Sequence, residues 1–117
     1  MEVLSLDTYT IDEVKKETVK MVNQFISQDI VKIVLYGSCA RGDFHADSDI
    51  DIALLTKCDR SDAKKYNDIL SRIATELAMK YFAIINFVCL PYDEYMDKKS
   101  WYPYFASIER EGEVLYG

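Results

Sequence analysis

The chain has 117 residues, half of them hydrophobic, and a formal net charge of -6. This length suits one domain over residues 1–117 with a compact core. The acidic balance disfavours a protein that grips nucleic acid through its phosphates. No apolar run is long enough to span a membrane, and Met1 to Asp12 lack the basic and apolar regions of a signal peptide, so we expect a cytoplasmic protein.

The first half of the chain predicts one helix followed by two strands. Thr10 and Glu13 form a capping-box signature, after which apolar residues recur at helical spacing to about Gln28. Residues 31–36 are a β-branched and apolar run of strand length, and residues 49–55 form a second such run.

The second half predicts further alternation of helices and strands. Ser61 is expected to cap a helix with an apolar stripe over residues 66–81, and residues 83–90 predict a third strand. Pro91 ends this strand and can open a short helix, and residues 101–111 are expected to be helical. Strands interleaved with helices indicate an α/β fold whose sheet has at least one helix-covered face.

A Gly–Ser pair and two acidic residues flank a ten-residue connection between the first two strands: Gly37 and Ser38 before it, Asp49 and Asp51 after it. Alternation along a strand puts both carboxylates on one face. Two such carboxylates repel each other unless cations lie between them, and Mg²⁺ prefers oxygen ligands of this kind. Gly37 allows close approach of a phosphate, Ser38 adds a hydroxyl and an N–H group, and Arg41 adds a cation. The pattern predicts a nucleoside triphosphate site in which Asp49 and Asp51 bind two Mg²⁺ ions.

These residues, together with Ala40, Arg41, Gly42 and Ser48, resemble the pattern of the minimal nucleotidyltransferases of the DNA polymerase beta-like superfamily. Residues 108–116 also resemble the family's C-terminal helix and closing strand. The resemblance implies a small mixed sheet packed with helices. It also implies Mg²⁺-dependent transfer of a nucleoside monophosphate, AMP from ATP, to an acceptor hydroxyl.

The small size of the chain bears on the acceptor. Single-domain members of this size resemble the antitoxin half of HEPN/MNT toxin–antitoxin pairs. This resemblance implies that the acceptor is a tyrosine of a partner HEPN toxin.

Asn86 on the third predicted strand departs from the family pattern. Family members commonly place a third carboxylate there, so Asn86 joins Asp49 and Asp51 as a catalytic candidate. An asparagine carbonyl can coordinate a cation but cannot accept a proton as a general base. Three interpretations stay open: a variant that retains transfer, a variant that only binds nucleotide or partner, and a substitution introduced by an experimenter. A register shifted by one residue, with Asn86 as a plain strand-end residue, is a further alternative.

The alternative from another class is a binding module that neutralises or regulates a protein partner by contact alone. Residues 101–105 form a dense aromatic group, of which most members are expected in the core. Exposed aromatic residues often mark interfaces, so a protein partner or a homo-oligomer is a secondary hypothesis.

Overall fold

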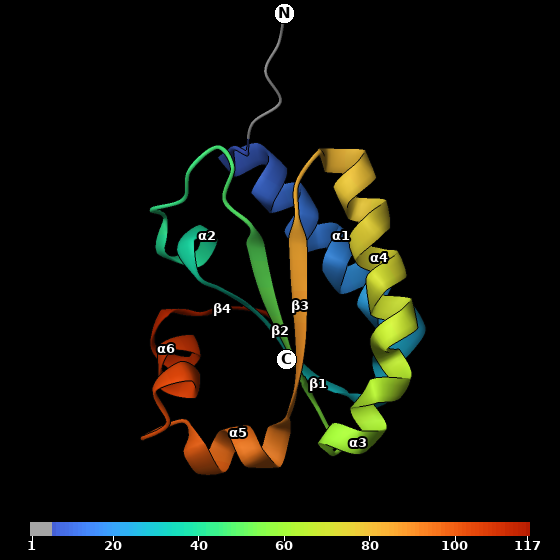
Figure 1. Ribbon diagram of the computed structural model, residues 1–117, viewed down its shortest axis with the longest axis vertical. Helices are drawn as coiled ribbons and strands as arrows, with labels where there is room; N and C mark the ends of the chain where they lie inside the picture. Colours follow the sequence, from blue (N-terminus) through green and yellow to red (C-terminus); the bar gives the residue numbers. More distant parts are fainter. Residues whose placement is uncertain (1–5) are drawn as a thin grey trace, which may run out of the picture.

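The computed structural model describes residues 6–117. Residues 1–5 lie outside the described part. They include the start of the predicted domain and the first five residues of the segment in which no signal peptide is expected. Within residues 6–117, one four-stranded sheet carries helices on both faces (Figure 1). This arrangement confirms the predicted mixed α/β fold.

The sheet has the order β3-β2-β1-β4. Its strands are β1 (Ile30–Tyr36), β2 (Ile50–Thr56), β3 (Ile85–Pro91) and β4 (Glu113–Tyr116). β1 runs antiparallel to both β2 and β4, whereas β2 and β3 are parallel. The parallel pair needs a long crossover, which a helix supplies.

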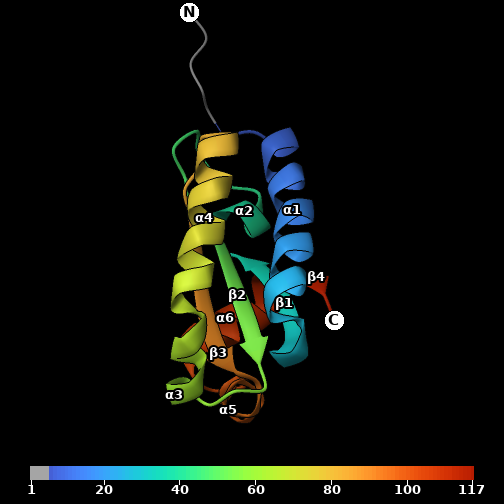
Figure 2. The same cartoon turned by 90° about the vertical axis from the view of Figure 1, so that its right-hand side faces the viewer.

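The helices divide between the two faces of the sheet. They are α1 (Thr8–Ile26), α2 (Ser38–Arg41), α3 (Arg60–Ala63), α4 (Asn67–Tyr81), α5 (Tyr92–Lys98) and α6 (Pro103–Glu111), with 3₁₀ turns at Ser27–Asp29 and Lys64–Tyr66. α1 and α4 lie side by side over one face (Figure 2), and α2, α5 and α6 lie on the other side of the sheet (Figure 1).

Successive side chains of the strands point to opposite faces of the sheet and pack into two hydrophobic cores. One core joins β1 and β2 to α1 and α4, and its members include Ile33, Leu35, Ile52, Leu54, Val14 and Leu77. The second joins the opposite face to α5 and α6, and its members are Val34, Ala53, Leu55, Leu90, Tyr95, Phe105 and Ile108. This second core covers only part of its face, since the residues that follow it along β2 and β3 toward the strand starts are polar.

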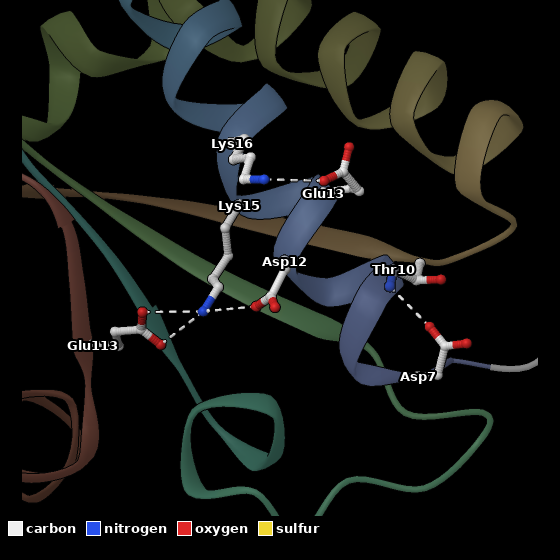
Figure 3. Close-up of polar contacts among 7 residues, drawn as sticks. All are labelled: Asp7, Thr10, Asp12, Glu13, Lys15, Lys16 and Glu113. Atoms are coloured by element: carbon white, nitrogen blue, oxygen red, sulfur yellow. Dashed lines mark hydrogen bonds and ion pairs between the residues drawn. The ribbon is translucent and has the colours of Figure 1, made fainter.

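An ion pair holds α1 against the edge strand β4 (Figure 3). The Lys15 ammonium donates to both carboxylate oxygens of Glu113, at 3.1 and 3.0 Å, and pairs with Asp12 at 3.3 Å. Because β4 is short and mostly exposed, this contact adds to its backbone pairing with β1.

Two predicted helix starts are wrong by a few residues. α1 is capped by Asp7, whose carboxylate accepts from the Thr10 N–H at 2.8 Å, so Thr10 lies inside the helix (Figure 3). α3 is capped by Asp59 rather than Ser61. In both places an aspartate two or three residues before the predicted cap accepts from a free N–H group of the first helical turn. Aspartate is at least as good an N-cap as serine or threonine.

The aromatic group near the C-terminus is less buried than predicted. Only Phe105 enters the core, at 2% exposed, whereas Trp101, Tyr102 and Tyr104 are all more than 40% exposed. The helix also begins at Pro103, not at residue 101. Proline fits the first turn of a helix, and a nine-residue helix has room for only one apolar stripe.

In the part of the chain from residue 6 onward, no helix is both long and apolar enough to cross a membrane.

Phe82 ends α4 in a left-handed conformation, with φ 56° and ψ 42°, and its side chain is 65% exposed. Glycine is the usual residue at such a position because a Cβ is strained there. We predict that Phe82→Gly raises the free energy of unfolding by about 0.5–1 kcal/mol in chemical denaturation. Phe82→Ala is the control, since it removes the ring but keeps the Cβ. Equal or lower stability of Phe82→Gly relative to Phe82→Ala would contradict the strain.

Candidate functional site

Strand register brings Asp51 and Asn86 together on the partly covered face. Asp51 is the cross-strand partner of Asn86 on β3 and of Tyr36 on β1. Each lies two residues from a strand residue that packs toward α5 and α6, so all three side chains point to that face. Asp49 precedes β2, and the fully buried Ile50 and Ile52 point the other way. The two acids therefore share a face, as the sequence predicts.

Asn86 contacts both carboxylates. Its side-chain amide nitrogen donates to Asp49 Oδ2 at 3.0 Å and to Asp51 Oδ1 at 3.2 Å. The alternative of a register shifted by one residue is therefore wrong, because the shift would turn Asn86 to the other face. Asn86 is exposed, so the three side chains meet at the surface beside the edge of the sheet.

Gly37 forms the other wall of this site. Its φ of 78° is left-handed, and a Cβ added here would lie only 2.7 Å from Asp51 Oδ2. A side chain at position 37 would therefore collide with the carboxylate. Ser38 begins the single turn of α2, and the Gly37 carbonyl accepts from the N–H groups of Ala40 and Arg41 at 3.1 Å each. The turn thus brings the backbone of Gly37 against the Asp51 carboxylate, with Ser38 as the next residue in the chain.

Arg41, the third predicted nucleotide-binding residue, is engaged by two carboxylates. Its Nε donates to Asp43 at 3.1 Å and its Nη1 donates to Glu111 of α6 at 3.1 Å. These hydrogen bonds raise the pKa of the guanidinium. No local pattern predicts the contact with Glu111, which lies 70 residues away from Arg41 in the chain.

Tyr36 and Tyr104 border the site on the side of α6. Their hydroxyls lie 2.9 Å apart, and their rings meet edge to face. Burial raises the pKa of Tyr36 well above its usual range, with smaller contributions from Tyr104 and Asp51. Tyr36 therefore stays neutral and can only exchange hydrogen bonds. Sequence reasoning missed this pair because its members lie on distant elements.

Two surface hollows are relevant to binding. One of about 430 Å³ follows the outer edge of β3 and is lined by Asn67, Leu70, Ser71, Ala74, Ile85, Asn86, Phe87 and Cys89. A larger one of about 550 Å³ lies between α1 and β4, lined by Asp12, Lys15, Lys16, Val19, Glu113, Val114 and Leu115. Only the first includes a residue of the acidic site, so size alone does not mark the site.

The site suits a divalent ion that is also held by a ligand. Within residues 6–117, no group of three or more His, Cys, Asp and Glu side chains could enclose a metal ion. Asp49 and Asp51 supply two carboxylates, which is the number that Mg²⁺ uses when substrate phosphates and water complete its shell. These two side chains therefore fit a Mg²⁺ ion bound together with a nucleotide.

We predict that Gly37→Ala destabilises the fold more than Gly42→Ala. Both glycines have positive φ, 78° and 86°, but a Cβ at position 42 meets nothing within 4 Å. Gly42→Ala should therefore cost about 1 kcal/mol of unfolding free energy, for backbone strain alone. Gly37→Ala should cost at least about 1 kcal/mol more, because Asp51 must move. Equal costs in chemical denaturation would contradict the close packing of Gly37 on Asp51.

Comparison with known proteins agrees with this geometry. The model of the nucleotidyltransferase domain family matches residues 11–106. One curated relative from Methanocaldococcus jannaschii is 34% identical over 86% of this chain and 93% of its own length, and its name describes a candidate protein adenylyltransferase. A second protein of that organism, with the same kind of name, is 32% identical over 63% of this chain and 73% of its own length.

Solved structures share the fold. A toxin–antitoxin structure with AMP-PNP aligns with a TM-score of 0.60 and 24% identity, over 88% of this chain and 73% of the other. The complex of a tri-AMPylated Shewanella oneidensis HEPN toxin with its MNT antitoxin aligns with a TM-score of 0.55 and 21% identity, over 92% and 72%. At these identities the likeness shows the fold. Together with the family model and the curated relatives, it leads to one conclusion: the chain belongs to the nucleotidyltransferase domain family, and the protein is a nucleotidyltransferase.

Proposed function

We propose that this protein transfers AMP from ATP to a tyrosine hydroxyl of a HEPN-type protein partner, in the role of an antitoxin. The observation that carries the proposal is the meeting of Asp49, Asp51 and Asn86 beside Gly37, whose lack of a side chain lets the turn approach Asp51 closely. Two findings support the acceptor class: the adenylyltransferase names of the relatives, and the AMPylated toxin in a structural neighbour.

In the proposed reaction the acceptor oxygen forms a bond to the α-phosphorus of ATP. The bond from this phosphorus to the bridging oxygen breaks, and pyrophosphate leaves with the bonding electrons. Gly37 and Ser38 bind the triphosphate through backbone N–H groups and the serine hydroxyl, in the manner of phosphate-binding turns. Arg41 is a weaker contributor, because Asp43 and Glu111 already take part of its hydrogen-bonding capacity.

Asp49 and Asp51 are the residues that would hold a Mg²⁺ ion accompanying the nucleotide. When bound, this ion supplies positive charge that offsets the charge of the phosphates. Of the three polar side chains that meet here, only the two carboxylates can accept the acceptor's proton, since an amide has no basic site at neutral pH. The Asn86 amide keeps the two carboxylates close together and leaves its carbonyl oxygen for a ligand.

A second candidate function is a binding module that acts on its partner by contact alone. The neutral amide of Asn86 on β3 favours this function. With an amide in place of a carboxylate, the site has one fewer negative charge with which to bind catalytic cations. The exposed aromatic side chains Trp101, Tyr102 and Tyr104 could serve either function as a contact surface.

A transfer assay separates the two functions. The protein is incubated with ATP labelled at the α-phosphate, Mg²⁺ and its HEPN-type partner. We expect label on a partner tyrosine, located by mass spectrometry. Asp49→Asn should reduce labelling by roughly 100-fold or more, because it removes both a metal ligand and a proton acceptor.

Asp47→Asn is the matched control for this assay. It removes the same charge from an exposed residue of the same connection, and Asp47 does not contact Asn86. Its labelling should therefore equal that of the wild type. A stable complex that forms without any label would contradict the transfer reaction and support the binding module.

A further inference from the structure

The Asn86 amide occupies the space between the two carboxylates on the β3 side. Its nitrogen bonds one oxygen of each acid, Asp49 Oδ2 and Asp51 Oδ1, at 3.0 and 3.2 Å. The opposite orientation of the amide would place its carbonyl oxygen against two anionic oxygens, which is repulsive. A neutral donor thus lies where a cation shared by both acids on this side would have to lie.

The remaining oxygen of Asp51 faces the other way. Asp51 Oδ2 packs against Gly37, at 2.7 Å from the place of a glycine Cβ. Asp51 Oδ1 therefore accepts from Asn86, whereas Oδ2 lies against the backbone of Gly37. Asp49 keeps Oδ1 free and is exposed. The Asp51 oxygen that does not bond Asn86 thus lies on the side of the turn where the triphosphate is proposed to bind.

Charge points to the same conclusion. Two carboxylates and a neutral amide offer two anionic ligands, one fewer than the site would have with a third carboxylate on β3. A second ion on the β3 side would have to displace the amide NH₂ group of Asn86. The described residues offer no third acidic side chain that could bind the ion there. Affinity for hard cations falls as charged ligands are removed.

Resting on the proposed function, we infer that this site holds a single divalent cation per bound nucleotide, on the side of Gly37. The Asn86 amide takes the place of a second cation between Asp49 and Asp51. The two ions expected from the sequence pattern are thereby reduced to one. The side chain at position 86 thus decides the number of ions: an amide leaves a one-ion site, and a carboxylate would make a two-ion site.

The test counts ions rather than turnover. Mn²⁺ is titrated into the protein saturated with a non-hydrolysable ATP analogue, and free Mn²⁺ is measured by electron paramagnetic resonance, with the analogue alone as the blank. We expect one bound Mn²⁺ per complex for the wild type. Asn86→Asp should bind two, with the dissociation constant of the second ion lowered at least about tenfold.

Asn67→Asp is the matched control, because it adds the same charge at an exposed position of the same hollow without contacting the carboxylates. It should still bind one ion. Thermal unfolding gives a second readout: without metal, Asn86→Asp should melt below the wild type because three carboxylates repel one another. Mn²⁺ should then raise its midpoint by more than it raises that of the wild type.

Two Mn²⁺ ions of similar affinity in the wild type would overturn the inference. So would no bound ion in the wild type, or a single ion in Asn86→Asp. Ion counting needs no acceptor protein. Absence of label on a HEPN-type partner would therefore contradict the proposed function and leave the ion count as it stands.

Discussion

The site depends on the close packing of Asp51 between Gly37 and Asn86. One carboxylate oxygen faces a glycine that has no room for a Cβ, and the other accepts from the amide of the neighbouring strand. This contact fixes the distance from the Gly37–Ser38 turn to Asp51. It also explains why residue 37 is a glycine, because a backbone that approaches a carboxylate so closely cannot carry a side chain; the φ of 78° favours glycine as well.

The sheet places this contact at the surface. β2 lies between β1, which leads into the turn, and β3, which carries Asn86, so three consecutive strands supply the site. α5 and α6 cover the same face farther along β2 and β3 and leave its other end open. The open end next to an edge strand suits a reaction whose acceptor belongs to another macromolecule, because a large substrate can approach without rearrangement of the fold.

Much of this arrangement was predictable from the sequence, and the features that were not predicted share identifiable physical reasons. The shared face of Asp49 and Asp51 follows from strand alternation. The candidate Asn86 came from the family resemblance alone, and the parallel register of β2 and β3 in the structure places it opposite Asp51. The helix caps were misplaced because Asp7 and Asp59 compete with Thr10 and Ser61 within a few residues. The contacts of Arg41 with Glu111 and of Tyr36 with Tyr104 join segments about seventy residues apart, and no local pattern encodes such pairs.

We propose that nucleotide binds at the Gly37–Ser38 turn, beside Asp49 and Asp51. An NMR titration of isotope-labelled protein with Mg²⁺ and a non-hydrolysable ATP analogue tests it most directly. We expect the NMR signals of the Gly37 and Ser38 backbone amides and of the Asn86 side-chain amide to shift together, with one binding constant. Shifts confined to the larger hollow between α1 and β4, at Lys15 and Val114, with Gly37 unchanged, would contradict it.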